Sequence, residues 1–443
     1  MTTRPLWAKE GVELDDDIVR YCAGDDWLLD KELLGFDLLG SIAHVKGLVA
    51  ISALETSDGE RLLSALEALF EEHKRGTFSP TPDDEDGHSA IERALVERLG
   101  ESGKRVHLGR SRNDQVLTAT RLWMREKLAH ASRLCIESAR VALQRAEETQ
   151  HLLLPGYTHL QRAVPSTAGF WFAGHAESLL EDAEAIARAC ALLDASPLGT
   201  AAGYGVNLPL DRDLAAKELG FSRLVVNGMC AQNGRGRLEA HALSALLCAM
   251  GTVRRLAWDL SLFSMAELSF VRLPDRFTTG SSIMPNKRNP DVVEIMRAAL
   301  ADVAGAHVEV WSTLSLPSGY QRDLQRTKGA VMRGVKASLA TLSLLPALLS
   351  EMAFDEERAA SALDDGMLAT DRAVELAAEG MPFRDAYRQV ARELAEAEGG
   401  RSREELVEAA RASVRARRSP GAPGALQIDR IAARADEVER MLG

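Results

Sequence analysis

The chain has 443 residues, a formal net charge of −12 at pH 7 and only 5% aromatic residues. This acidic balance argues against a general nucleic-acid surface, because phosphate backbones are bound through clustered Lys and Arg. Strong helix formers are abundant, so an all-α protein is expected. The length suits about three domains of ordinary size or one elongated multi-helix body.

Cysteine usage and hydropathy indicate a reducing, aqueous location. The five cysteines form no CxxC pair, so neither a disulfide framework nor a zinc site is indicated. The N-terminus has no apolar signal core. The longest uncharged apolar-rich run, 337–350, is shorter than the roughly 20 residues that a membrane helix needs. We expect a soluble, cytoplasmic protein with no membrane partner.

Residues 1–108 mix short helical patterns with breakers, and we expect them to form a mostly helical N-terminal domain. His44, in the apolar helix predicted for 37–48, is expected to be a satisfied core residue. The acidic run 83–86 and the following Gly-His-Ser are interpreted as a solvated loop. Ser89 is then the predicted cap of the helix that carries Glu92.

A dense polar segment, Gly-Arg-Ser-Arg-Asn-Asp-Gln, occupies 109–115. Asn113 or Asp114 is expected to cap a helix of close to forty residues that runs to about His151. The segment then has two interpretations. It is either capping plus surface charge, or a carboxylate receptor, since two arginines beside a helix N-terminus grip planar anions well.

Pro-Gly-Tyr-Thr-His-Leu-Gln follows at 155–161, and we interpret it as a breaker-rich link between two long helices. An apolar seam from Phe172 to Leu193 predicts the second of these helices. From the residues alone, His159 is more often an ordinary turn histidine than a catalytic one. Residues 196–238 are irregular and glycine-rich before the pattern becomes helical again.

The connector 276–291, RFTTGSSIMPNKRNPD, lies between two helical seams, 246–260 and 293–310. It is longer and more polar than bundle helices need, which favours a functional lid over solvated slack. Gly280 permits unusual backbone angles, and two prolines stiffen the segment. Asn289 and Pro290 are interpreted as an N-cap and a first-turn proline, so the next helix is expected to start there.

A further polar break at 316–328 precedes the C-terminal region. From about Met352 the pattern is that of a smaller helical domain, with a turn at 420–425 before a last helix. The basic run of Arg415, Arg417 and Arg418 is interpreted as a solvated helix end. The predicted division is therefore 1–108, a central bundle at 109–351 and a C-terminal domain at 352–443.

Two levels of family resemblance follow from these segments. The connector resembles the signature pattern Gly-Ser-Ser-x-Met-Pro-x-Lys-x-Asn of the fumarase/aspartase superfamily, matched at Gly280, Ser281, Ser282, Met284, Pro285, Lys287 and Asn289. The segments 109–115, 156–161 and 316–328 are similar to those of the argininosuccinate lyase family within it. The resemblance covers nearly the whole chain.

The resemblance implies an elongated central bundle of long helices with smaller flanking domains. It implies reversible elimination of fumarate from argininosuccinate to give arginine, without a metal or an organic cofactor. Ser281 is then the general base, aided by positive charge on Lys287, and His159 belongs to the acid arm. The implied substrate-binding residues are Ser111, Arg112, Asn113, Thr158, Lys287, Asn289, Tyr320, Gln325 and Lys328. A homotetramer whose sites each use three subunits is also implied.

Two segments depart from the family pattern. No role is transferred to the first, 21–26, and the second, 227–238, is expected to shape the pocket, and hence the substrate preference, differently. Two alternatives stay open. Another superfamily lyase, acting on a different N-substituted succinate, would share the signature segment and the fold. A delta-crystallin-like structural protein would share the fold without needing Ser281, His159, Lys287 and Asn289 together.

Overall fold

The computed structural model describes residues 15–397 and 399–443, and α-helices dominate it. Within these ranges the strands are short and form three two-stranded sheets, so the all-α prediction is confirmed. Contacts divide the chain into two compact units. Unit 1 takes the chain up to Ala129, then Arg188–Ala245 and Val303–Lys336; unit 2 takes His130–Ala187, Leu246–Asp302 and Ala337–Gly443. The three-domain division stays a prediction.

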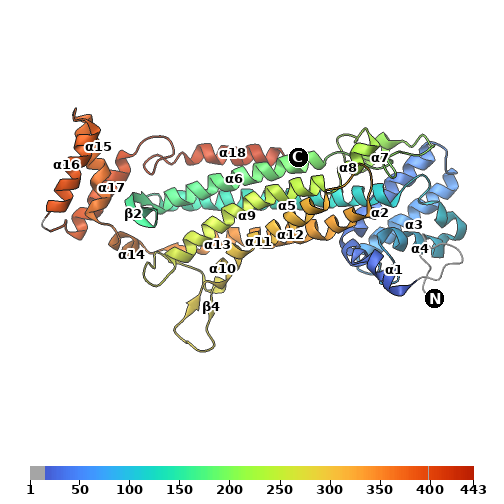
Figure 1. The fold of residues 1–443 in the computed structure, drawn as a ribbon, viewed down its shortest axis with the longest axis horizontal. Coiled ribbons are helices and arrows are strands. Elements are labelled where there is room, and N and C mark those ends of the chain that lie inside the picture. The colour runs from blue at the N-terminus through green and yellow to red at the C-terminus, as the bar shows by residue number, and fades with distance from the viewer. Residues whose placement is uncertain (1–14, 398) are drawn as a thin grey trace. The chain divides into compact units, whose positions relative to one another are not determined.

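Five of the described helices contribute residues to both units. They are α5 (Arg112–Thr149), α6 (Ala168–Leu193), α9 (Arg237–Phe263), α11 (Leu300–Thr313) and α12 (Arg326–Leu342). The seam predicted for 246–260 lies on α9 and is fully buried. In unit 2, α5 and α6 lie side by side (Figure 1), and Ser132 Oγ on α5 donates to the Ala183 carbonyl on α6 at 2.8 Å.

The helix predicted for 293–310 is two helices. α10 (Asp291–Ala298) ends before Ala299, and α11 follows. Pro290 occupies the cap position of α10, whereas Asn289 pairs with Thr279 in a two-residue ladder. Asn289 is therefore extended backbone of a strand and not the predicted helix cap.

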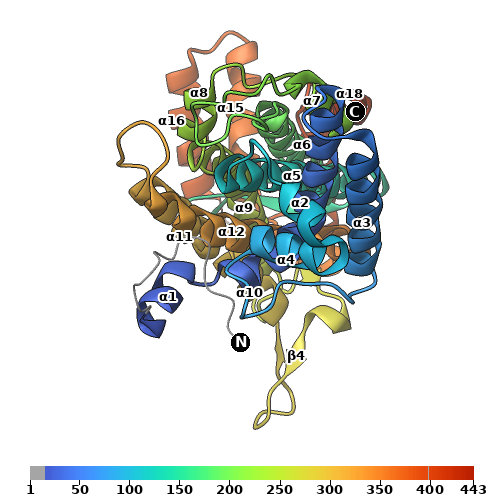
Figure 2. The same cartoon turned by 90° about the vertical axis from the view of Figure 1, so that its right-hand side faces the viewer.

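Unit 1 has a helical core of its own. Its further elements are α1 (Asp16–Ala23), α2 (Asp26–Ala50), α3 (Thr56–Lys74), α4 (Gly87–Leu99), the 3-10 turns η1 (Gly100–Arg105) and η3 (Arg322–Gln325), α7 (Arg212–Glu218) and α8 (Gly228–Asn233). Leu38, Leu66 and Ile91 from α2, α3 and α4 share one buried cluster, and the three helices are seen together in Figure 2. Burial of such side chains stabilises the unit by about 1.5–3 kcal/mol each.

The two helix N-caps predicted in unit 1, for α4 and α5, fall on other residues than expected. Asp86, not Ser89, caps α4, because its carboxylate accepts from the Ser89 backbone N–H at 2.9 Å. At the start of α5, Ser111 Oγ accepts from the Asn113 N–H at 3.2 Å, and the Ser111 N–H donates to Asp114 Oδ1 at 3.0 Å. This is a reciprocal capping arrangement, so neither Asn113 nor Asp114 is the cap itself.

Unit 2 contains the strands and the C-terminal helices. Its elements are β1 (Leu153–Thr158), β2 (Gln161–Thr167), β3 (Val271–Arg272), η2 (Asp275–Phe277), β4 (Thr279–Gly280), β5 (Arg288–Asn289), α10, α13 (Leu345–Glu351), β6 (Ala353–Phe354), α14 (Glu356–Ser361), η4 (Asp365–Leu368), α15 (Ala369–Ala378), α16 (Phe383–Glu396), α17 (Arg403–Ala416) and α18 (Ile428–Arg440). The last helix returns to the bundle, since Arg434 on α18 bonds to Glu184 on α6 at 2.9 Å. Arg417 is paired with Asp371 at 2.7 Å, so the basic run at 415–418 is only partly solvated.

Two helical stretches are long and apolar enough to cross a membrane by length and composition, contrary to the expectation that none would be. They are Asp26–Ala50 and Arg322–Glu351, and 61% and 50% of their apolar windows are buried. In α2 the buried residues include Leu34 and Leu38 of the unit 1 core together with the acids Asp30 and Asp37. Burial against neighbouring helices is the ordinary state of a core helix.

Candidate functional site

Arg112, the first residue of α5, lies against the acidic run 83–86. Its guanidinium bonds to Glu85 Oε2 at 3.0 Å and to Asp86 Oδ2 at 2.9 Å, and it donates to Ser89 Oγ at 3.1 Å. Burial raises the pKa of Asp86, and Arg112 opposes that effect. The acidic run is therefore part of a buried ion-pair network, and its interpretation as a solvated loop is wrong.

Lys328 lies inside α12, and 2% of its side chain is exposed. Its ammonium contacts Asp26 at 2.9 Å and Asp30 at 2.6 Å, and Asp30 also accepts from the Gly87 backbone N–H at 2.8 Å. Burial would lower the pKa of Lys328, but the two carboxylates outweigh it and raise that pKa. We call Lys328, Asp26 and Asp30 the Lys328 cluster. Both acids were missed from the sequence because they are distant from Lys328 along the chain.

The two remaining predicted residues of the 316–328 break belong to the same unit. Gln325 donates to the carbonyls of Cys22 at 3.2 Å and Ala23 at 3.0 Å. These hydrogen bonds fix the position of the segment 21–26, which departs from the family pattern. Tyr320 has the Arg235 guanidinium 5.5 Å from its ring centre. Unit 1 thus contains Ser111, Arg112, Asn113, Tyr320, Gln325 and Lys328. Arg322 links Arg112 to Gln325, because it bonds to Glu85, a partner of Arg112, at 3.2 Å and to the Cys22 carbonyl, a partner of Gln325, at 2.8 Å.

Two neighbours of Arg112 in the segment 109–115, Arg110 and Asp114, have structural roles. Asp114 is fully buried and accepts from the backbone N–H groups of Gly199 and Ala201, both at 2.9 Å. Burial raises its pKa to about 6. Arg110 is also buried and donates to Ser41 Oγ at 3.0 Å. Gly109, Ser111, Arg112 and Asn113 are the half-buried residues of this segment, and its other residues are buried.

One group of described side chains has ligand atoms close enough for a metal ion: His88, Glu92 and His107, within 4.8 Å of one another. His88 donates from Nδ1 to Gln115, which leaves a lone pair on its Nε2. Arg110 can only donate, and it donates to Nδ1 of His107 at 2.6 Å. Neutral His107 therefore carries its proton on Nε2, and the two rings stack with centres 3.7 Å apart. This tautomer does not fit a metal site.

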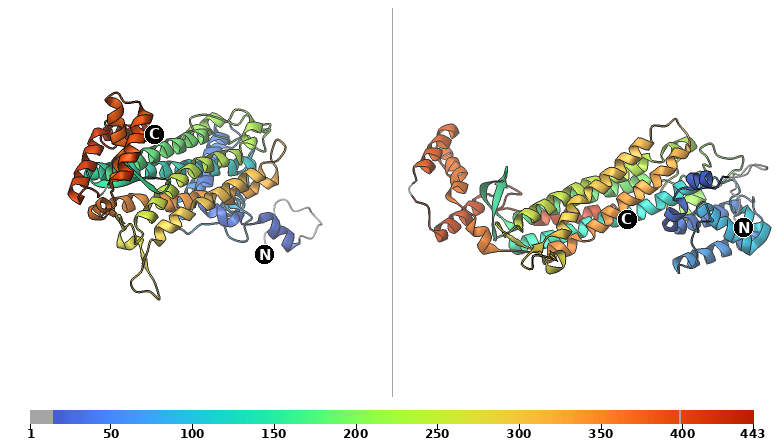
Figure 3. Two further views of the ribbon diagram at one scale, coloured as in Figure 1. Left: turned by 60° about the vertical axis from the view of Figure 1, so that its left-hand side comes forward. Right: turned by 60° about the horizontal axis from the view of Figure 1, so that its bottom comes forward.

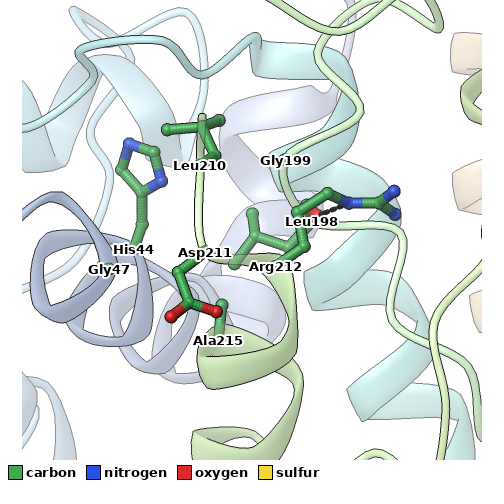
Figure 4. A pocket seen from close by; sticks show the side chains of 8 residues that line it. All are labelled: His44, Gly47, Leu198, Gly199, Leu210, Asp211, Arg212 and Ala215. Atoms are coloured by element: carbon green, nitrogen blue, oxygen red, sulfur yellow. Dashed lines mark hydrogen bonds between the residues drawn. The ribbon is translucent and has the colours of Figure 1, made fainter. Parts of the chain in front are cut away.

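His44 is a satisfied core histidine, as predicted. Its Nε2 meets the Leu108 carbonyl at 2.9 Å, and burial lowers its pKa to about 3. It lines a cavity of about 10 Å³ with Leu198, Asp211 and Arg212 (Figure 4), in which Arg212 donates to the Leu198 carbonyl at 3.0 Å. That volume holds one water molecule at most and is far below the size of a substrate pocket.

In unit 2, the predicted link at 155–161 is a β-hairpin. Thr158 pairs with Gln161 across a two-residue turn, in which His159 has φ 55° and Leu160 φ 58°. Two left-handed residues make the turn type that suits hairpins, although Asn and Gly are its usual residues. The sequence signal was weak for this reason. Thr158 and His159 are exposed at its tip.

The signature segment 276–291 forms a second hairpin, closed by β4 and β5, and it projects from the surrounding helices (Figures 1 and 3). Ser281 Oγ accepts from the backbone N–H groups of Ile283 at 3.3 Å and Met284 at 3.1 Å. These two donors favour the alkoxide form of Ser281. Lys287 is exposed and forms no ion pair with any residue in the described ranges, and Gly280 has no left-handed φ.

The site residues predicted in unit 2 therefore lie on two separate projections. The β1–β2 hairpin and the signature hairpin stand apart within the unit (Figures 1 and 3). Thr158 and His159 are on the first, and Ser281, Lys287 and Asn289 on the second.

Comparison with known proteins gives consistent results. A family model described as Lyase matches residues 20–305. The argininosuccinate lyase of Xylella fastidiosa (strain 9a5c) is 52% identical over 429 residues, 97% of this chain and 95% of that protein. That of Sorangium cellulosum (strain So ce56) is 52% identical over 435 residues, 98% and 99% of the two chains.

Solved structures show the same fold. A crystal structure of EDDS lyase in complex with formate matches with a TM-score of 0.79 at 23% identity, over 97% of this chain and 91% of that one. Class II fumarase from Schistosoma mansoni matches with a TM-score of 0.72 at 18% identity, over 88% and 92%. Together with the signature hairpin and its serine, the sequence identities establish that the chain belongs to the argininosuccinate lyase family.

Proposed function

We propose that this chain eliminates fumarate from argininosuccinate to release arginine, with Ser281 as the general base. The base takes a proton from a succinyl carbon beside a carboxylate, the carbon–nitrogen bond breaks, and the guanidinium nitrogen leaves with a proton from the acid arm. The observation that carries the proposal is identity of about half the residues with curated argininosuccinate lyases over nearly the whole chain. This favours argininosuccinate over a different N-substituted succinate.

The geometry of Ser281 supports its role. Its Oγ is held by two backbone N–H groups in an exposed hairpin, so it is oriented without being buried. Lys287 and Asn289 on the same hairpin are proposed to bind the carboxylate on which charge develops, where preorganised donors contribute most. His159, exposed beside Thr158 on the other hairpin, is proposed to serve the leaving nitrogen.

The surroundings of Arg112 and Lys328 support binding of the arginine part of the substrate. Arg322 joins the network through Glu85 at 3.2 Å. The acids Asp26, Asp30, Glu85 and Asp86 are ion-paired with the cations Arg112, Arg322 and Lys328, and Arg235 adds a fourth positive charge near Asp26. We propose that carboxylate oxygens of this set bind the guanidinium or ammonium group of the arginine part. We propose that Ser111, Asn113, Thr158, Tyr320 and Gln325 complete the binding set.

We further propose a cytoplasmic homotetramer with shared active sites. The exposed apolar side chains on the long helices support an assembly, since Trp258 on α9 is 47% exposed and Trp311 on α11 is 52% exposed. Exposed aromatic residues are enriched in protein interfaces. Shared sites would let different copies supply the two hairpins and the Lys328 cluster.

Replacement of the serine tests the proposed base. A positioned base contributes about 10²- to 10⁴-fold in rate, so Ser281→Ala should lower kcat by about a hundredfold or more with the fold unchanged. The assay follows fumarate absorbance on addition of argininosuccinate. Ser282→Ala is the matched control, because Ser282 is more exposed and accepts neither of the two backbone N–H groups. A near-normal rate in Ser281→Ala would refute the assignment.

A further inference from the structure

The tip of the β1–β2 hairpin carries an exposed leucine in an unfavourable conformation. Leu160 is 74% exposed, and both turn residues have positive φ. For non-glycine residues this conformation costs roughly 1–2 kcal/mol each, and such strain concentrates at functional sites. Glycine or asparagine would relieve it, so the turn holds His159 and Leu160 at a cost that their side chains must offset elsewhere.

The signature hairpin carries a matching apolar side chain. Ile283 is 85% exposed and lies two residues after Ser281. Its backbone N–H is one of the two that hold Ser281 Oγ. Each hairpin therefore presents a bare aliphatic side chain beside the residue to which the proposed function assigns catalysis.

Each hairpin has local contacts: close backbone packing and an ion pair on the first, and two ion pairs on the second. On the first, a Cβ at Gly156 would lie 2.8 Å from the Val164 carbonyl oxygen, and Arg162 bonds to Asp364 at 2.8 Å. On the second, Arg288 bonds to Asp275 and Arg276 to Glu351. The hairpins stand apart in one copy (Figure 3), so a contact between their tips calls for a second copy.

We propose that Leu160 of one copy packs against Ile283 of a second copy, and that this contact positions His159 against Ser281. The inference rests on the proposed function, in which both residues act on one substrate. It adds two positioning residues that touch no reacting atom. Burial of two aliphatic side chains also offsets the strain of the turn.

A double-mutant cycle tests the coupling. Leu160→Ala and Ile283→Ala should each lower kcat about tenfold, and the double variant should lose no more than either single one. KM for argininosuccinate should stay within about twofold, and Leu160→Met should restore most of kcat. Val226→Ala is the control, because Val226 is 84% exposed in unit 1 and its effect should combine independently with Leu160→Ala. Multiplicative losses in the Leu160 and Ile283 pair would overturn the coupling.

Oxidative cross-linking of a Leu160→Cys, Ile283→Cys double variant tests the contact itself. We expect a covalent dimer on a non-reducing gel, which neither single variant gives. A cross-link within one chain, or no cross-link in the assembled protein, would overturn the proposed contact. The Ser281→Ala result separates the two failures: near-normal turnover there refutes the base, whereas loss of turnover without the cross-link refutes only the Leu160–Ile283 contact.

Discussion

The Lys328 cluster and the signature hairpin present similar cations in opposite surroundings. Lys328 is 2% exposed and is held by two carboxylates, whereas Lys287 is exposed on a projecting hairpin. A buried charge must be paired because burial penalises it strongly. An exposed lysine keeps its hydration and stays available to a ligand. The ion pairs of Lys328 therefore stabilise the fold before any ligand binds, whereas Lys287 keeps its charge free to bind a substrate anion.

The largest expected effect is on stability, from removing the buried cation. Lys328→Met should leave Asp26 and Asp30 facing each other in the interior and destabilise the protein by about 3–5 kcal/mol. Urea unfolding measures the change. Lys336→Met on the same helix is the control, since its ion pair with Glu32 is 56% and 39% exposed and should contribute less than about 1 kcal/mol. Equal losses of unfolding free energy in the two variants would show that burial does not distinguish Lys328 from Lys336.

The next effect is on catalysis, from removing the exposed cation. Lys287→Met should lower kcat/KM by about a hundredfold, the scale for losing one charge-stabilising donor. Its free energy of unfolding should stay unchanged because the side chain has no partner to lose among the described residues. Lys287→Arg, which keeps the charge, should recover part of the rate. Steady-state kinetics and urea unfolding together make the measurement. A loss of stability without a loss of rate would show that Lys287 has a structural role and not a catalytic one.

The smallest expected effect is on the pH dependence of stability, from a buried carboxyl group that has no cation beside it among the described residues. Asp182 on α6 is 7% exposed, Oδ2 has no partner among described groups, and burial raises its pKa to about 6. Since the folded pKa lies above the unfolded value of 3.8, the protonated form favours folding. Its contribution is full below about pH 4 and is lost as pH rises to about 6, by up to about 3 kcal/mol. Asp182→Asn should abolish that part of the pH dependence of urea unfolding, and an unchanged pH profile would contradict the assignment.

The long helices were predictable because one apolar face of a helix repeats every three to four residues. The α9 seam is buried as the pattern predicts. The His159 turn was not predictable, since it lacks the Asn or Gly that signals a two-residue hairpin. The pairing of Lys328 with Asp26 and Asp30 was also hidden, because side chains about 300 residues apart carry no local signal. The roles of the site residues came from family resemblance, and those roles stay proposals.

The order in which the signature hairpin can form follows from its outer ladder. Val271 pairs with Phe354 and Arg272 with Ala353. The strand β3, which leads into the hairpin, can therefore pair only after β6, about 80 residues further along the chain, has been synthesised. Contacts between distant parts of a chain form slowly, because the intervening loop must close first. During translation, the serine-bearing hairpin should therefore gain its outer ladder only after Ala353 and Phe354 have left the ribosome.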